Sequence, residues 1–500
     1  MLLTVRKAWG IQNQSKLTSK QILRDNKHIK ASKLPESLIG KAWGWAGERL
    51  RACTDRHLIK NDIYGGYGVM IKIRELSDRL TNGSFDEKLA ALYCRPVTEL
   101  SYYKNRIEHL TELFCESFAA DREREIAICS AAGRTEIGGN HTDHQRGRVL
   151  TGSVDLDALA CIAENGTTMI RIFSEGFGET DVDLTNLEVV EEEKNSTASL
   201  IRGIAARIAS FGYEVRGFDA CVISDVPGGS GLSSSACFEI LIGEAMNKLF
   251  CDLKLSMVDL AKIGQYAENV FFGKPSGLMD QMGCAVGGII TINFKDKENP
   301  EIHPVEVDFS KAGYALCIID SGADHADLTD DYAAIPAEMR AVAACLGKEV
   351  LSETEESAFY AALPEIQKKV GDRAVLRAVH YFKDCAHVQA QVAALEKGDF
   401  DGFLELVRRS GVSSYEYLQN ICTYRDPAQQ PVAVALAIAE HALNGKGAVR
   451  VHGGGFAGTI QAFVPMNQVD AFRKEVDAGL FEGACRITYI RPVGGCVLAD

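Results

Sequence analysis

The chain has 500 residues, of which 46% are hydrophobic and 24% charged, so it has the composition of an ordinary globular protein with room for more than one domain. Its formal net charge of −14 argues against a nucleic-acid partner, and no apolar run is long enough for a membrane span. The 15 cysteines form no Cys-x-x-Cys pair, so we expect reduced thiols in a cytoplasmic protein rather than a disulfide framework or a zinc site.

Residues 1–69 differ from the rest of the chain. They contain 13 Lys and Arg against 5 Asp and Glu, a net of +8, which leaves −22 for residues 70–500. All three tryptophans also lie in this segment, and it has little helical or strand periodicity. A basic binding arm is one interpretation; we expect instead an extension outside the fold, with Met70 as the true start after a misplaced start site.

The sequence pattern becomes regular after Met70 and mixes helices with strands, which is typical of an α+β or α/β domain. Polar residues crowd the segment 133–147, which we expect to be a loop after a strand that begins at Glu125. The other predicted elements are short helices within 71–92, helices over 102–118, 199–211 and 260–272, and strands over 149–159, 168–173 and 219–226.

A glycine- and serine-rich stretch, Val226–Ala236, reads Val-Pro-Gly-Gly-Ser-Gly-Leu-Ser-Ser-Ser-Ala. Apolar residues follow it at helical spacing, so the stretch opens onto a helix N-terminus. Free backbone N–H groups and the positive end of the helix dipole make such a loop suited to a polyphosphate. The spacing fits neither a Walker A loop nor a Rossmann fingerprint, and a flexible turn with a serine N-cap is the alternative.

Two carboxylates stand near this loop in the sequence. Glu268 lies on the predicted helix 260–272, and Asp280 lies in the turn that follows it. An acidic residue beside a phosphate loop commonly binds a metal ion or acts as a base, although each could also be an ordinary solvated carboxylate.

A second α+β region is predicted after a boundary near residues 309–313. An apolar strand begins at Tyr314, and a glycine-rich turn, Val451–Gly458, lies near the end of the chain. The other predicted elements are helices over 336–346, 387–397, 400–410, 432–444 and 469–479, and strands over 459–464 and 487–490.

Three segments in this order resemble the GHMP kinase superfamily and, within it, the galactokinases. They are Gly133-Arg134 with His141-Thr142-Asp143, Pro227–Ala236, and His452–Gly458. The first is similar to the galactokinase signature Gly-Arg-x-Asn-Leu-Ile-Gly-Glu-His-Thr-Asp-Tyr, and Gly277–Gln281 is similar to the family's Gly-Ile-Met-Asp-Gln. The resemblance runs from about residue 70 to residue 500.

The resemblance implies a two-domain GHMP kinase fold. It has an N-terminal ribosomal-protein-S5-like domain over 70–310, a C-terminal ferredoxin-like domain over 311–500, and the active site in the cleft between them. It also implies an ATP-dependent sugar 1-kinase that uses Mg²⁺ and galactose, with small-molecule partners only.

The resemblance further implies a role for each matching residue. Asp280 and Arg134 are catalytic, and Ser235 and Glu268 bind the metal. The substrate-binding residues are Asn140, His141, Asp143, Gly277 and Tyr332. The ATP-binding residues are Pro227, Gly228, Gly229, Ser230, Gly231, Leu232, Ser233, Ser234, Ser235 and Ala236, and the structural glycines of the third segment are Gly453, Gly454, Gly455 and Gly458.

The sequence departs from the family pattern mainly in the sugar-type segment. Asn140 replaces a glutamate that accepts a hydrogen bond from the sugar's 6-hydroxyl, Glu136 replaces an asparagine, and His144 replaces a tyrosine. A neutral amide does not repel a carboxylate, so galacturonate is the runner-up substrate, followed by galactosamine or N-acetylgalactosamine.

Two further functions are open, a sugar sensor without catalytic activity and a kinase for mevalonate or homoserine. The intact serine run counts against the first, and the His-Thr-Asp segment counts against the second.

Overall fold

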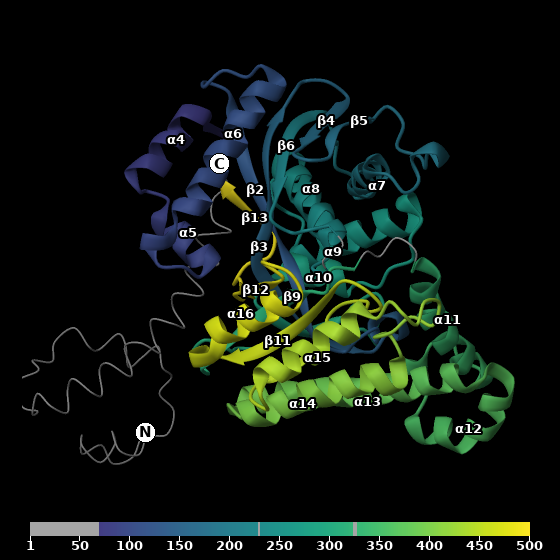
Figure 1. Ribbon diagram of the computed structural model, residues 1–500. Coiled ribbons are helices and arrows are strands. Elements are labelled where there is room, and N and C mark those ends of the chain that lie inside the picture. The colour runs from purple at the N-terminus through teal and green to yellow at the C-terminus, as the bar shows by residue number, and fades with distance from the viewer. Residues whose placement is uncertain (1–69, 229–230, 324–327) are drawn as a thin grey trace, which may run out of the picture. The chain divides into compact units, whose positions relative to one another are not determined.

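Two β-sheets organise the part of the chain that this computed structural model describes, which comprises residues 70–228, 231–323 and 328–500 (Figure 1). These residues belong to a single compact unit. The predicted extension 1–69 lies outside the described residues.

The larger sheet has nine strands and is built around the long antiparallel pair of β2 and β3. Its main strand order is β1-β2-β3-β6-β4-β5; β13 also pairs with β2, β7 with β3, and β8 with β7. The strands are β1 (Ile71–Lys72), β2 (Glu125–Gly138), β3 (Arg148–Glu164), β4 (Met169–Ser174), β5 (Gly178–Asp183), β6 (Phe218–Ser224), β7 (Ile289–Asn293), β8 (Glu301–Pro304) and β13 (Cys496–Ala499).

Helices cover both faces of this sheet because its central strands are apolar on both sides. Side chains alternate across a strand, so Ile126 and Ile128 of β2 pack on one face while Ala127 and Cys129 pack on the other. Helices α4 (Ile73–Asn82), α5 (Asp86–Tyr93) and α6 (Ser101–Phe118) cover the first face. Helices α7 (Thr197–Ser210), α8 (Ser234–Phe250), α9 (Met257–Tyr266) and α10 (Met279–Val286) cover the second face.

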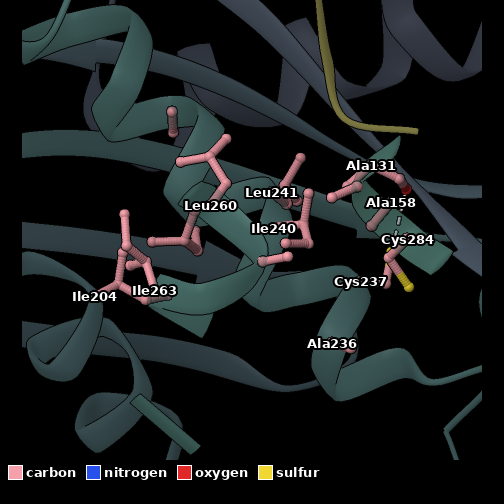
Figure 2. Close-up of a cluster of buried hydrophobic side chains, with 14 of the residues drawn as sticks. Ala131, Ala158, Ile204, Ala236, Cys237, Ile240, Leu241, Leu260, Ile263 and Cys284 are labelled. Carbon is pink, nitrogen blue, oxygen red and sulfur yellow. Dashed lines mark hydrogen bonds between the residues drawn. The ribbon is translucent and has the colours of Figure 1, made fainter. Parts of the chain in front are cut away.

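Helix α8 packs against helices α7, α9 and α10 and against strands β2 and β3, and Figure 2 shows part of the apolar cluster that it joins. Its buried residues Ile240 and Leu241 pack with Leu260 and Ile263 of α9 in the same apolar cluster. This packing fixes the helix whose N-terminus receives the glycine- and serine-rich loop.

The smaller sheet has the order β10-β11-β9-β12 and is antiparallel throughout. Helices α15 (Pro431–Leu443) and α16 (Val469–Gly479) pack on one face, and α13 (Asp372–Lys397) and α14 (Phe400–Ser413) pack on the other. Helices α11 (Thr329–Cys345) and α12 (Glu356–Val370) pack against α13. The strands are β9 (Tyr314–Asp320), β10 (Ala448–Val451), β11 (Thr459–Pro465) and β12 (Cys485–Thr488).

The two sheets share an apolar cluster. Ile137 of β2 and Leu150 of β3 pack with Leu316 of β9 and Phe463 of β11. The chain end also returns to the larger sheet, because β13 pairs with β2. A division of the chain at residue 310 stays a prediction, and the structure adds that the last strand belongs to the first sheet.

Several predicted elements differ from those observed. Strand β2 continues to Gly138, so residues 133–138 are not a loop; hydrogen bonding to β3 extends the strand despite its polar side chains. The predicted helix 260–272 changes at Tyr266 into a π-helical turn, η5 (Ala267–Phe272).

The C-terminal region also differs from its prediction. Helix α11 begins at Thr329 and accommodates Pro336, and the predicted helix 387–397 is only the last part of α13. Helix α12 was missed, and the last strand is β13 rather than 487–490. The short helical turns are η2 (Val97–Glu99), η3 (Asp143–Gln145), η4 (Glu191–Glu193), η6 (Leu351–Glu353), η7 (Ser414–Leu418, a π-helix) and η8 (Met466–Gln468).

In the described part of the chain, no helix combines the length and apolar character needed to cross a membrane. The cysteines within the described ranges are free thiols, most of them buried.

Candidate active site

The glycine- and serine-rich stretch connects β6 to α8, whose first residue is Ser234. Gly231 has a φ of +70°, and a Cβ atom there would lie 2.5 Å from the hydroxyl oxygen of Thr459. Only glycine therefore lets the loop approach the first residue of β11 so closely. Two predicted ATP-binding residues, Gly229 and Ser230, lie outside the described residues.

Asp280, the predicted catalytic residue, sits in the first turn of α10 and joins two of the three sequence motifs. Arg134 of β2 donates to Asp280 Oδ1 from Nε at 2.8 Å and from Nη2 at 2.7 Å. Ser233 donates to Asp280 Oδ2 at 2.5 Å. Arg134 also donates to the carbonyl oxygen of Gly231, so one guanidinium holds both the aspartate and the loop.

These contacts keep Asp280 ionised. Burial acts to raise the pKa of Asp280, but the charge of Arg134 and the hydrogen bonds from Ser233 and Arg134 outweigh it and hold the pKa below its ordinary value. An ionised carboxylate beside a phosphate loop is equipped to accept a proton.

The second predicted carboxylate, Glu268, lies on the π-helical turn η5 and is buried. Lys274 Nζ lies 3.1 Å from one of its oxygens, and Gln281 donates to the other at 3.0 Å. Gln281 donates from the same nitrogen to Glu239 at 2.9 Å.

Glu268 has oxygen donors of the kind that Mg²⁺ prefers in its neighbourhood, but the described residues contain no group of three or more His, Cys, Asp or Glu that could hold a metal ion by themselves. Glu239 Oε1 is buried and has no hydrogen-bond partner among the described residues, and burial together with the charge of Glu268 raises the pKa of Glu239 well above its usual range. Ser235 lies one helical turn before Glu239, on the same face of α8. Carboxylate and hydroxyl oxygens are the ligand types that Mg²⁺ prefers.

Three of the five predicted sugar-binding residues, Asn140, His141 and Tyr332, contact the glycine turn 453–455. His141 Nε2 lies 3.0 Å from the carbonyl oxygen of Gly454, and the hydroxyl of Tyr332 donates to the carbonyl oxygen of Gly455 at 2.6 Å. Burial and the neighbouring His144 lower the pKa of His141 to about 3, so the ring is neutral near pH 7 and Nε2 donates this hydrogen bond.

Gly277 lies directly against Asp143. A Cβ atom at Gly277 would stand only 1.8 Å from Asp143 Oδ2, so a side chain at this position would displace the carboxylate. The structure therefore brings the segment that contains Asp143 next to the Gly277–Gln281 turn.

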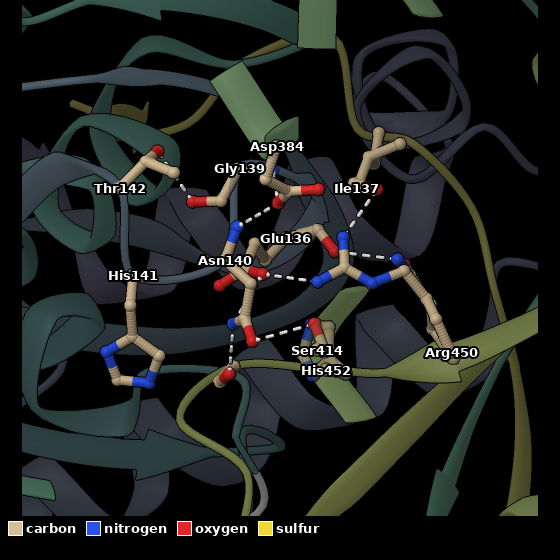
Figure 3. A network of polar contacts seen from close by, with 12 residues as sticks. Glu136, Ile137, Gly139, Asn140, His141, Thr142, Asp384, Ser414, Arg450 and His452 are labelled. Atoms are coloured by element: carbon tan, nitrogen blue, oxygen red, sulfur yellow. Dashed lines mark hydrogen bonds and ion pairs between the residues drawn. The ribbon is translucent and has the colours of Figure 1, made fainter. Parts of the chain in front are cut away.

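Asn140, in contrast, points into the protein. It is fully buried, its amide nitrogen donates to Glu136 at 2.8 Å and to the carbonyl oxygen of Gly453 at 2.7 Å, and its amide oxygen accepts from Asn420 at 2.7 Å (Figure 3). Arg450 of β10 donates to the same oxygen of Glu136 at 2.8 Å. Burial raises the pKa of Glu136 to about 7, and Arg450 and Arg134 oppose this shift.

Helix α13 supports the backbone of the same loop. Asp384 accepts from the backbone N–H groups of Gly139 and Asn140 at 3.1 and 2.9 Å, and His380 donates to the carbonyl oxygen of Asn140 at 2.8 Å. These bonds hold the backbone of residues 139 and 140 separately from the contacts that the Asn140 side chain makes.

Sequence reasoning missed several residues of this site, namely Arg450, Asn420, Asp384, His380 and Lys274. Arg450 carried a usable signal, since a charged residue within an apolar strand just before a glycine turn needs a buried partner. Asn420 and Asp384 carried none, because nothing local distinguishes them.

Comparison with known proteins finds relatives over most of the chain. The family model of the GHMP kinase N-terminal domain matches residues 199–288, and the galactokinase galactose-binding signature matches residues 112–164. A galactokinase from Glaesserella parasuis serovar 5 (strain SH0165) is 30% identical over 347 residues, which cover 69% of this chain and 86% of that relative.

The chain belongs to the galactokinase family. A galactokinase from Streptomyces coelicolor is 29% identical over 371 residues, covering 73% of this chain and 91% of that protein. The crystal structure of Lactococcus lactis galactokinase complexed with galactose superimposes with a TM-score of 0.67 at 25% identity, covering 78% of this chain and 99% of that one. The GHMP kinase fold predicted from the sequence is thereby confirmed, and the chain is an ATP-dependent kinase.

Proposed function

We propose that this chain transfers the γ-phosphoryl group of ATP to the anomeric hydroxyl of galactose, giving galactose 1-phosphate and ADP. The observation that carries the proposal is the contact of Arg134 and Ser233 with Asp280, which joins the β2 motif, the phosphate loop and the Gly277–Gln281 turn. Membership of the galactokinase family supports galactose as the acceptor.

Asp280 serves as the base. A sugar hydroxyl is a weak nucleophile, and the ionised carboxylate accepts its proton as the oxygen attacks the γ-phosphorus and the bond to the ADP oxygen breaks. Arg134 keeps Asp280 ionised and offsets negative charge on the transferring group. The loop residues 227–236 hold the nucleotide phosphates at the N-terminus of α8.

Ser235 and Glu268 would hold a magnesium ion, which supplies positive charge to neutralise the nucleotide phosphates. Lys274 Nζ lies 3.1 Å from Glu268 and would place a second positive charge beside the magnesium ion. The carboxylate Glu239 lies behind them, linked through Gln281.

The sugar-binding loop, defined as residues 139–144, faces its ligand with His141 and Asp143. Because Gly277 has no side chain, its backbone lies directly beside the carboxyl group of Asp143. The hydroxyl of Tyr332 donates to the carbonyl oxygen of Gly455 and so holds the glycine turn. Because its Nε2–H donates to Gly454, neutral His141 has Nδ1 left as an acceptor, and the carboxyl oxygens of Asp143 are further acceptors for sugar hydroxyls.

A sugar panel tests the proposal. Purified protein with MgATP is assayed for ADP release on galactose, 6-deoxygalactose, galacturonate, galactosamine and N-acetylgalactosamine. We expect the highest kcat/KM on galactose. A preference for galacturonate or for an amino sugar would overturn the galactose assignment but keep the kinase, and ATP binding without turnover on any sugar would indicate a sensor.

A further inference from the structure

Two departures from the galactokinase signature lie four residues apart and are opposite in kind. Glu136 stands where the signature has asparagine, and Asn140 stands where it has glutamate. Taken together they keep one carboxylate and one amide but exchange their positions.

The structure places these two side chains in contact. Asn140 Nδ2 donates to Glu136 Oε1 at 2.8 Å, and both side chains are buried (Figure 3). Arg450 fixes the carboxylate end, since its Nη2 donates to the same oxygen at 2.8 Å and its Nη1 donates to the carbonyl oxygen of Ile137 at 2.9 Å. A buried carboxylate needs such a cationic partner, and Arg450 supplies it at position 136.

The amide end has no capacity left for a sugar hydroxyl. Asn140 Nδ2 uses its second hydrogen for the carbonyl oxygen of Gly453 at 2.7 Å. Its oxygen accepts from Asn420 at 2.7 Å and from Ser414 at 3.3 Å. All four hydrogen-bonding positions of the amide are therefore filled from within the protein.

The hydrogen bond from Asn140 to Gly453 lies next to the phosphate loop. Gly453 lies against the phosphate loop, since a Cβ atom on it would stand 3.3 Å from the carbonyl oxygen of Gly231. The next two carbonyls of the turn are held by His141 and Tyr332. Asn140 thus ties the sugar-binding loop to the turn that touches the phosphate loop.

We propose that Glu136 and Asn140 are an exchanged acid–amide pair with a positioning role: Glu136, anchored by Arg450, holds the Asn140 amide on Gly453, so position 140 secures the sugar-binding loop instead of binding the sugar. This inference rests on the proposed function only for the assignment of residues 139–144 as a sugar-binding loop. Its physical content, the coupling of the two residues, does not depend on the identity of the substrate.

A double-mutant cycle tests the pair in the full-length protein. Asn140→Glu places a second carboxylate beside Glu136, and Glu136→Asn leaves Arg450 without its counter-charge, so we expect each single variant to lower Tm by roughly 5 °C or more. The double variant Glu136→Asn/Asn140→Glu restores one carboxylate, one amide and one guanidinium, and we expect it to recover at least half of that loss. Asn299→Glu, at an exposed position, controls for adding a charge.

The kinetic readout separates positioning from plain stability. At a temperature where each variant is folded, we expect KM for galactose to rise about tenfold in Asn140→Glu while kcat changes less, and to return toward the wild-type value in the double variant. A double variant no more stable than the weaker single variant, or unable to fold, would overturn the proposal, as would single variants with unchanged Tm and KM. Should no variant, wild type included, use galactose, the proposed function fails and the Tm cycle alone decides the pairing.

Discussion

Two arginine–carboxylate pairs stand side by side in this molecule and do different things. Arg134 and Glu136 are alternate residues of one strand, β2; Arg134 pairs with Asp280, and Glu136 pairs with Arg450. The Asp280 side chain is 38% exposed, whereas the Glu136 side chain is 2% exposed. From this difference we infer that the more exposed pair takes part in the reaction and that the buried pair supports the site.

The protonation equilibria of the two carboxylates differ in the same way. The pKa of Asp280 lies below its ordinary value because Arg134 and Ser233 outweigh burial, while burial raises the pKa of Glu136 to about 7 despite Arg450. A reactive base must be ionised at working pH, and a buried structural acid need not be.

The largest expected effect comes from removing the reactive carboxylate. Asp280→Asn should lower kcat by about a hundred- to ten-thousand-fold, because the base is lost while the shape of the side chain is kept. Nucleotide affinity, measured by titration with ATP, should stay close to wild type. Tm should fall because buried Arg134 loses its counter-charge, so kcat is measured at a temperature where the variant is folded. Asp401→Asn, at an exposed position on α14, is the matched control. Near wild-type turnover in Asp280→Asn would mean that the wrong residue has been named as the base.

Removing the cation of the buried pair should act on stability instead. Arg450→Met leaves Glu136 buried without its partner, and the free energy of unfolding should fall by about 3–5 kcal/mol. Denaturant titration measures this loss, and kcat of the folded fraction should change far less than in Asp280→Asn. Arg409→Met removes an exposed arginine and should have little effect on unfolding. If Arg450→Met and Arg409→Met lost the same free energy of unfolding, the buried pair of Arg450 and Glu136 would not stabilise the fold.

The raised pKa of Glu136 gives a pH signature. The folded protein holds the proton up to about pH 7, whereas the unfolded chain releases it near 4.5, so the stability this group contributes is complete below pH 4.5 and is lost as pH rises through 7. The wild-type free energy of unfolding should therefore fall by about 3 kcal/mol more across this range than that of Glu136→Gln, which does not titrate. Parallel stability curves for the two proteins would contradict the assignment.

A smaller effect is expected at Ser233. Ser233→Ala removes one of the hydrogen bonds that lower the pKa of Asp280, so that pKa should rise. Because the ionised carboxylate is the active form and is lost as pH falls through its pKa, the acid limb of kcat/KM should move to higher pH. Ser310→Ala, an exposed position, should leave the profile unchanged. An acid limb that stays in place in Ser233→Ala would show that another group sets it.

The sequence indicated Arg134 and Asp280, the pair that we propose to react, but not the buried pair, for a physical reason. Arg134, Asp280 and the serine run each sit in a short motif whose glycines and polar residues are recognisable locally. Glu136 and Arg450 lie 314 residues apart, and only the packing of β10 against the end of β2 brings them together. The sequence also could not show that the Asn140 amide is fully hydrogen-bonded within the protein, because that depends on Asn420 and on Ser414 of η7.

Identifying the position of the transferred phosphate tests the central claim most directly. Purified protein is incubated with MgATP and galactose, and the sugar product is examined by phosphorus and proton NMR, with ADP measured in the same sample. We expect a single sugar phosphate, substituted on the anomeric oxygen and formed in equal amount with ADP, and we expect it to be lost in Asp280→Asn. A product phosphorylated at another hydroxyl, or ADP released without any sugar phosphate, would contradict this claim.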